Sequence, residues 1–149
     1  MNALDALHQR TSMPRLSGPA PDADALDNIF RAALRAADHG LLRPWRFVTV
    51  QGESLQRLGE LFASVARQDK PDISPAELDK VRQKPLRAPM IVVVISSPKE
   101  HPKIPKFEQD LSAAAAAQNM LVAAFAQGLG AMWRTGSMAY HPSVKEGLG

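Results

Sequence analysis

The chain of 149 residues has the length of one domain, and its 45% hydrophobic residues are enough for a real core. It contains no cysteine, which excludes disulfide bonds and thiolate chemistry, and the N-terminal MNALDALHQR lacks the apolar stretch of a signal peptide, so we expect a cytoplasmic protein. The net charge of +3 suits an anionic ligand, but the cations are scattered and form no block typical of nucleic-acid binding.

A short first helix is expected over residues 2–9, where Leu4 and Leu7 lie three residues apart on one face. Pro14 cannot continue a helix and pushes the residue before it into an extended conformation. The segment from Arg10 to Arg15 carries two guanidinium groups and two hydroxyls. Such groups could grip a phosphate, or they could be the ordinary side chains of a solvated loop.

A second, stronger helix is expected from the N-cap Asp22 to Ala37. Arg35 lies opposite its apolar stripe near the C-terminal end, where a cation is favoured by the helix dipole. Gly40 is expected to adopt the left-handed conformation that ends the helix, with His39 as a cap or surface residue before it. The buried stripe is predicted to contain Leu26, Ile29, Phe30, Ala33, Leu34 and Ala37.

The middle of the chain alternates strand and helix patterns. Residues 41–51 are expected to form a loop and then a strand after Pro44, with Trp45 in the core or in a pocket wall. The apolar run 89–96 is bounded by prolines and predicts a central strand that is buried on both faces. Helices flanking a few strands predict an α+β or mixed α/β fold in three layers. The other expected elements are an amphipathic helix at 54–67, a charged helix at 75–84, and loops at 68–75 and 97–106.

The stretch from Phe107 to Gly136 is expected to organise the rest of the chain. It begins as a helix that is apolar around most of its circumference, which predicts a buried central helix. Gly128 and Gly130 are expected to end this helix, and residues 131–134 to leave the core as a short strand. An aromatic ring, a cation and a hydroxyl then arrive together at the rim of the core, in the residues Trp133, Arg134 and Thr135.

No side chain is an obvious catalytic group. The four histidines lack metal-ligand spacing, and the chain has no nucleophile elbow, phosphate-binding P-loop or dinucleotide fingerprint. We therefore expect neither a metal nor a catalytic side chain. If the protein is an enzyme, a bound cofactor is expected to supply the reactive atom while the protein supplies grip and orientation.

Four segments in register resemble the FMN-dependent nitroreductase family, and most closely its compact NAD(P)H nitroreductase branch. They are Arg10-Thr11-Ser12 after a first helix, LLRPWRFVTV, APMIVVV, and the Ala-rich helix that ends in GLGAMWRTG. The resemblance implies a single domain over 1–149 with an α+β fold, a three-layer α/β/α sandwich that has a mixed sheet and a long central buried helix. It also implies a homodimer with FMN at the interface, no nucleic acid or membrane partner, and ping-pong hydride transfer from NADH or NADPH to nitro compounds, quinones or similar acceptors.

The same resemblance implies the site residues. The pair Arg10 and Ser12 would grip the FMN phosphate, and two of the other positions would reach the flavin plausibly from the partner subunit, namely Arg35 and His39. The full cofactor-binding set is Arg10, Thr11, Ser12, Arg35, His39, Trp133, Arg134 and Thr135. A stretch assigned more loosely to the nicotinamide consists of Ala123, Ala124, Phe125, Ala126, Gln127 and Gly128.

The chain departs from the family pattern at three places. Thr11 stands where a second arginine is frequent, so one phosphate contact would be weaker or replaced by Arg134. Arg43 stands where an amide residue before Pro-Trp is usual. The sequence stops at Gly149, so the family's C-terminal strand and tail are expected to be missing from it. Two alternatives stay open: a flavin-binding relative with other chemistry, such as flavin breakdown or dehalogenation, and a non-catalytic dimeric flavin-binding module.

Overall fold

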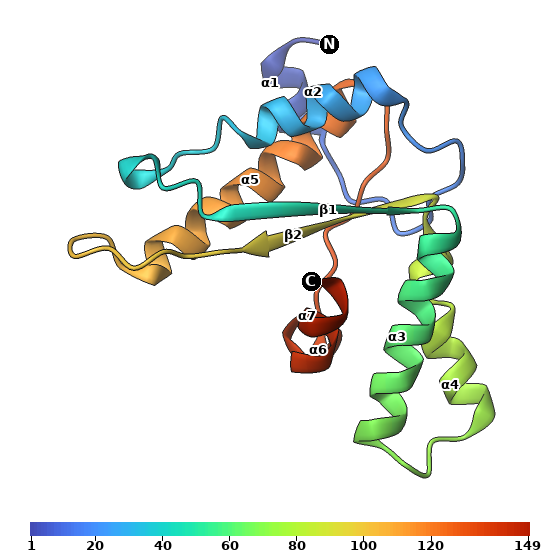
Figure 1. Cartoon of the computed structure of the whole chain (residues 1–149). Coiled ribbons are helices and arrows are strands. Elements are labelled where there is room, and N and C mark those ends of the chain that lie inside the picture. Colours follow the sequence, from blue (N-terminus) through green and yellow to red (C-terminus); the bar gives the residue numbers. More distant parts are fainter. The chain divides into compact units, whose positions relative to one another are not determined.

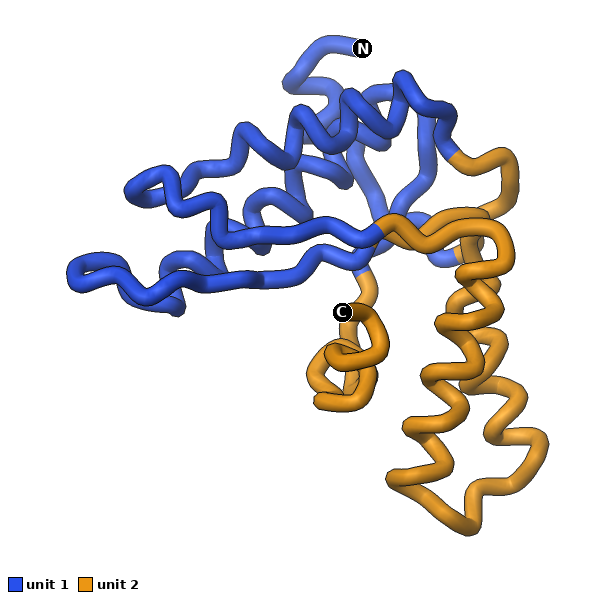
Figure 2. Tube along the Cα trace, in the orientation of Figure 1, with its two compact units in different colours: residues 1–14, 21–48, 93–133 blue, residues 15–20, 49–92, 134–149 orange.

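The structure is a computed structural model that describes all residues from 1 to 149 (Figure 1). The chain divides into two compact units (Figure 2). Unit 1 comprises residues 1–14, 21–48 and 93–133, and unit 2 comprises residues 15–20, 49–92 and 134–149. None of the helices combines the length and the apolar character needed to cross a membrane.

The N-termini of the first two helices of unit 1 lie where the sequence predicts them. The Asn2 side chain accepts a hydrogen bond from Asp5 N at 2.9 Å, and the Asp22 side chain accepts one from Ala25 N at 2.8 Å. Each bond satisfies a backbone donor that has no partner within its helix. The helices of this unit are α1 (Ala3–Gln9), α2 (Ala23–Ala33), the 3-10 helix η1 (His39–Leu41) and α5 (Lys106–Ala126).

The end of α2 differs from the prediction, which placed it at Ala37. The hydrogen bonds tighten to the i→i+3 pattern at Arg35 N to Ala32 O and Ala36 N to Ala33 O, both 3.1 Å, and the helix ends there. Ala33 is fully buried, whereas Leu34 is 54% exposed and Ala37 is also exposed. The predicted stripe is therefore wrong in its last turn, although Gly40 has the predicted left-handed conformation at φ 75°.

The helices α2 and α5 lie side by side in unit 1 (Figure 1), and hydrogen bonds from polar side chains join them. The Gln127 side chain accepts from Asn28 Nδ2 at 3.1 Å and donates to Ala25 O at 3.3 Å, near the start of α2. Asn119 Nδ2 donates to Ala32 O at 3.1 Å, near the end of α2. Because later residues of α2 meet earlier residues of α5, the two helices run antiparallel.

The burial of α5 is confined to one face. Phe107 and Leu111 are 68% and 54% exposed, so the prediction of a helix buried around most of its circumference is wrong within this chain. Gly128, with φ 79°, follows the end of the helix as predicted. The buried residues of α5 are Gln109, Ser112, Ala113, Ala116, Ala117, Met120 and Ala124.

The segment after α5 is extended but forms no strand, so the strand predicted at 131–134 is wrong. One backbone hydrogen bond, from Met13 N to Ala131 O at 3.0 Å, joins it to the segment that follows α1. A strand requires a repeating ladder of such bonds, and a single one does not make it.

The sheet has two antiparallel strands, β1 (Trp45–Gln51) and β2 (Met90–Ser96), rather than the expected mixed sheet. Trp45 is buried at 9% exposure, which confirms its predicted place in the core. The apolar residues of β2 are only half-buried, so a strand buried on both faces is not what this chain forms. With β1 as its single partner, β2 leaves its other edge unpaired.

Unit 2 is built on a helical hairpin, α3 (Glu53–Asp69) and α4 (Pro75–Arg82), close to the predicted helices at 54–67 and 75–84. A β-carbon on Gly59 would lie 2.3 Å from Arg82 O, so only glycine permits this approach of the two helices. Ser74 and Glu77 form a capping box at the start of α4. The remaining elements are η2 (Lys84–Arg87), α6 (Ser137–Tyr140) and α7 (Pro142–Leu148).

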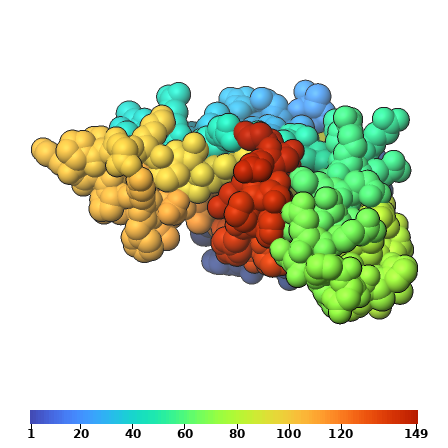
Figure 3. All heavy atoms as spheres, turned by 60° about the horizontal axis from the view of Figure 1, so that its bottom comes forward, coloured from blue at the N-terminus to red at the C-terminus, as the bar shows by residue number.

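The C-terminal helix α7 packs against α3 within unit 2, as the red and green atoms of Figure 3 show. A β-carbon at Gly147 would lie 2.7 Å from Leu61 Cδ2, which indicates a close fit. His141 links the same two elements: its Nδ1 accepts from Ser143 N and its Nε2 lies 3.2 Å from Asp69 Oδ1. The ring therefore both caps α7 and pairs with the end of α3.

Candidate functional site

The loop after α1 and the segment after α5 lie side by side in unit 1. Arg10 N donates to Ala6 O at 3.1 Å and closes α1, which packs against α5 through the buried Ala6. The hydrogen bond from Met13 N to Ala131 O then aligns the two segments. The structure thus brings two of the predicted cofactor segments together, residues 10–12 and the segment that ends at Trp133.

The side chains of the first segment suit an anion. Arg10 is half-buried, and its guanidinium makes no hydrogen bond or ion pair within the chain, while Thr11 and Ser12 are exposed. A guanidinium fork binds a phosphate through two parallel N–H donors, and hydroxyls add short bonds. The guanidinium of Arg10 and the hydroxyls of Thr11 and Ser12 therefore fit the phosphate of FMN.

The second segment supplies an exposed ring followed by two polar residues. Trp133 is 46% exposed, although tryptophan is usually well covered in a folded chain. Arg134 and Thr135 are also exposed and follow directly in the chain, as the first residues of the last part of unit 2. The predicted exit of the central helix is thus accessible to a ligand.

The stretch predicted to contact the nicotinamide, 123–128, is the last turn of α5 and the turn after it. Ala124 is buried at 6% exposure, and the Gln127 side chain also donates to Ala123 O at 3.0 Å. Through its hydrogen bonds with Asn28 and Ala25, Gln127 also makes this stretch a main link between α5 and α2. Its last three positions, Ala126, Gln127 and Gly128, are exposed to solvent.

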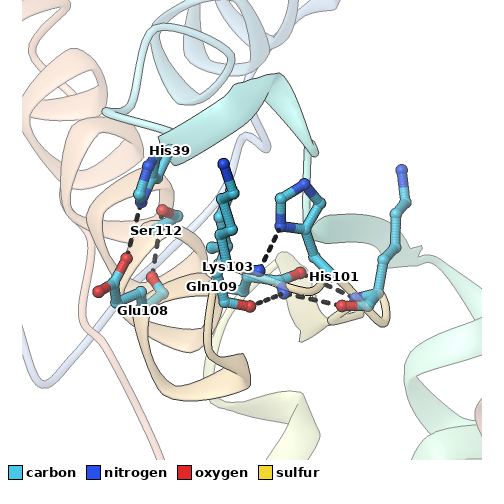
Figure 4. Close-up of polar contacts among 8 residues, drawn as sticks. His39, His101, Lys103, Glu108, Gln109 and Ser112 are labelled. Carbon is cyan, nitrogen blue, oxygen red and sulfur yellow. Dashed lines mark hydrogen bonds and ion pairs between the residues drawn. The ribbon is translucent and has the colours of Figure 1, made fainter.

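The other two predicted cofactor residues lie along α5, away from the segment that follows it. His39 Nδ1 is 2.9 Å from Glu108 Oε2 in the first turn of α5 (Figure 4). Arg35 follows the C-cap of α2, three residues after Ala32, whose carbonyl accepts from Asn119 in the second half of α5. With a rise of 1.5 Å per residue, the 21 residues of α5 span about 30 Å, so His39 lies nearly a full helix length from the segment after α5.

The backbone around His39 is unusual. Leu41 and Arg43 have positive φ values of 54° and 48°, which residues with a β-carbon seldom adopt. Asp38 Oδ2 accepts a hydrogen bond from Arg43 N at 2.7 Å across this turn. Leu41 is 80% exposed, so the turn displays an apolar side chain to solvent. Strained turns of this kind are frequent at binding sites.

Gln109 is a structural residue that the sequence reasoning missed. It is 2% exposed; its Oε1 accepts from Lys99 N and its Nε2 donates to Lys99 O, both at 2.8 Å (Figure 4). A third, longer bond of 3.4 Å runs from Nε2 to Ile104 O. These bonds hold the loop at 97–106 against α5. Helical spacing gives the signal, since Gln109 shares a face with Ala113, four residues later.

The same loop is basic. Lys99, Lys103 and Lys106 are cationic, and Lys106 pairs with Glu100. The hydrogen bond and the charge of Glu100 raise the pKa of Lys106 above its usual value, so this lysine stays charged at neutral pH. Within this loop, His101 Nδ1 accepts a hydrogen bond from Lys103 N at 3.2 Å (Figure 4).

Comparison with known proteins agrees with the family resemblance found in the sequence. The model of the nitroreductase family matches residues 7–149. The Escherichia coli K12 protein named "Putative NAD(P)H nitroreductase YdjA" is 40% identical over 149 residues, which are all of this chain and 80% of that protein.

Two solved structures share the fold. A nitroreductase-like family protein from Bacillus cereus has 23% identity and a TM-score of 0.77, and it aligns with 100% of this chain and 78% of its own. A nitroreductase from Desulfovibrio desulfuricans, solved in complex with FMN, has 25% identity and a TM-score of 0.70, with coverage of 98% and 75%. The α+β fold of this chain is therefore that of nitroreductase-like proteins.

Proposed function

The chain belongs to the nitroreductase family, and on that premise we propose that it is an FMN-dependent oxidoreductase that takes a hydride from NADH or NADPH. The electrons would pass to nitro compounds, quinones or similar acceptors in a ping-pong cycle. The protein is an enzyme of the NAD(P)H nitroreductase kind, as its curated relatives are named. The choice of acceptor is part of the proposal.

The observation that carries the proposal is the hydrogen bond between Met13 N and Ala131 O. It places the cation and hydroxyls of residues 10–12 beside the segment that ends in Trp133. We assign the phosphate to Arg10 and Ser12, with Thr11 between them, because a dianion needs donors that have no internal partner. Trp133, Arg134 and Thr135 would line the cofactor next to this cradle.

A homodimer would complete the site. His39 pairs with Glu108 in the first turn of α5, whereas the loop after α1 pairs with the segment that follows the other end of α5, so we assign His39, and with it Arg35, to the FMN of the partner subunit, as the resemblance implies. The large apolar side chains exposed on unit 1 agree with a subunit contact, since monomeric proteins seldom display many of them. They include Leu34, Phe107, Leu111 and Trp133, which are between 46% and 68% exposed.

The bound FMN would supply the hydride chemistry, and the residues of the chain would bind and orient it. A cation near the pyrimidine end of the flavin stabilises negative charge there, which is a role open to Arg35 or Arg134. No side chain is needed as an acid or base when the flavin is reduced. We assign no catalytic residue and keep 123–128 as a proposed nicotinamide contact.

Two finer expectations stay predictions, namely the single domain over 1–149 and the cytoplasmic location. The three-layer sandwich with a mixed sheet is not what this chain forms, because its two strands are antiparallel. The structure of this chain has two strands, and the chain spans 80% of its Escherichia coli relative.

The absorption spectrum of the purified protein tests the cofactor directly. We expect a yellow protein whose flavin bands bleach when NADH or NADPH is added without oxygen and return when a nitroaromatic compound is added. A protein that stays colourless after FMN is added would refute the proposal. Bound flavin that neither nicotinamide reduces would instead favour a non-catalytic flavin-binding module.

Arg10→Ala tests the phosphate cradle. Loss of one charge-assisted contact is expected to weaken FMN binding by about 10- to 100-fold in a fluorescence titration. Arg31→Ala is the matched control, because Arg31 is exposed on α2 and pairs only with Asp27 at 3.8 Å. Equal FMN affinities for the two variants would remove Arg10 from the site.

A further inference from the structure

Glu108 and His39 meet at the start of α5, with Glu108 Oε2 2.9 Å from His39 Nδ1 (Figure 4). We propose that Glu108 is a positioning residue that turns the His39 ring so that Nδ1 faces the protein and Nε2 faces the flavin. This inference rests on the proposed function, in which His39 contacts FMN. It adds Glu108, which is not among the site residues predicted from the sequence.

The Glu108 side of the pair is built on a rigid element. Glu108 lies in the first turn of α5, where the helix dipole stabilises its negative charge. Its backbone carbonyl accepts a hydrogen bond from Ser112 Oγ at 3.3 Å, and Ser112 is buried. The next residue, Gln109, fastens the loop beside it. The carboxylate therefore starts from a fixed backbone rather than from a mobile loop.

The backbone of His39 is also held on both sides. On one side, Asp38 accepts the hydrogen bond from Arg43 N. On the other, Gly40 lies so close to Ile104 that a β-carbon on it would be 2.6 Å from Ile104 Cδ1. Ile104 is 4% exposed and belongs to the loop that Gln109 holds. The ring of His39 thus has one main freedom left, the rotation of its side chain, which Glu108 restricts.

The chemistry of the pair fixes the tautomer. An ionised carboxylate can only accept hydrogen bonds, so Nδ1 must carry the proton. In the neutral ring Nε2 is then an acceptor, and in the imidazolium it is a donor. Nε2 has no partner within the chain. The pyrimidine edge of a flavin offers both an N–H donor and carbonyl acceptors, so it can pair with Nε2 in either state.

Stability alone does not account for the pair. The side chains of His39 and Glu108 are 64% and 47% exposed, and ion pairs at such positions add little to the stability of a fold. The pair can still fix the orientation of the His39 ring, because the backbones of both residues are held in place and a preferred orientation does not require a large net stabilisation.

Nuclear magnetic resonance of histidine-labelled apoprotein tests the tautomer without flavin. At a pH where the ring is neutral, the nitrogen shifts should show the proton on Nδ1 in the wild type. Glu108→Ala should lose this preference, and Glu108→Gln should keep it, because an amide oxygen can still accept. Glu100→Ala is the control, since Glu100 pairs with Lys106 and not with His39. A proton on Nε2 in the wild type, or no change in Glu108→Ala, would overturn the proposal.

Flavin binding tests the direction of Nε2. FMN should shift the Nε2 resonance, and Glu108→Ala should weaken FMN binding about fivefold, as expected for one ordinary hydrogen bond. In a His39→Ala background the same substitution should have no further effect. The positioning role would be refuted if Glu108→Ala weakened FMN binding equally in the His39→Ala background, or if the Nε2 resonance did not shift when FMN binds. A wild type that binds no FMN would refute the proposed function instead, while the apoprotein spectra still decide the tautomer.

Discussion

Removing the Gln109 side chain tests how the loop before α5 is held. Gln109→Ala deletes two hydrogen bonds of 2.8 Å to Lys99 and one of 3.4 Å to Ile104. Each bond is worth about 1 kcal/mol net, and the peptide groups left unpaired add to the loss, so we expect a destabilisation of about 2–4 kcal/mol. Gln109→Leu keeps most of the volume and should be similarly unstable, which separates the lost bonds from a cavity.

Urea unfolding of these variants provides the measurement. Gln118→Ala is the matched control, because Gln118 lies on the same helix, is exposed, and makes no hydrogen bond through its side chain. Its stability should change by no more than about 0.5 kcal/mol. Hydrogen exchange should show faster exchange of the Lys99 amide in both Gln109 variants and no change in Gln118→Ala. The reasoning is refuted if the Gln109 and Gln118 variants unfold at the same urea concentration.

Two further predictions concern unit 2. Gly59→Ala forces a β-carbon against Arg82 O and should destabilise the α3–α4 hairpin by about 1–3 kcal/mol in urea unfolding, whereas an unchanged midpoint would contradict the close approach. Hydrogen bonds from Ser74 and the charge of Lys70 lower the pKa of Glu77 from 4.5 to about 2. The ionised Glu77 therefore stabilises the folded state above pH 4.5, and this contribution is lost as the pH falls towards 2. The melting-temperature difference between wild type and Glu77→Gln should shrink over that range, and a constant difference would refute the assignment.

Helix starts could be predicted from the sequence, because local chemistry determines them. Asp22 caps α2 as predicted, and the first helix and the two helices of unit 2 lie within two residues of their expected starts. The end of α2 was predicted wrongly because Leu34 and Ala37 continue the apolar period. The structure leaves both exposed, so their apolar character is not explained by the core of this chain.

Burial could not be predicted for β2 and α5 for the same reason. An apolar run predicts that an element is buried, but it does not say whether the same chain or another chain buries it. In this chain β2 is half-buried, and Leu111 of α5 is exposed. Gln109 shows the opposite case: a polar residue is among the most buried, because its partners are backbone groups of a loop.

The site could be predicted only in part. The pairing of residues 10–12 with the segment after α5 agrees with the resemblance, although the binding roles of these residues stay predictions. The position of His39 at the far end of α5 could not be read from the sequence, because it depends on the antiparallel packing of α2 on α5. The pairing of His39 with Glu108 depends on the same arrangement.

The hydrogen bond between Met13 and Ala131 also bears on the order of events during synthesis. Met13 is synthesised early and Ala131 much later, so the bond cannot form until the ribosome has released Ala131. Until then the seven residues of α1 are too few to be stable as an isolated helix. The N-terminal arm is therefore expected to dock late, and to be among the first parts to detach when the protein is heated.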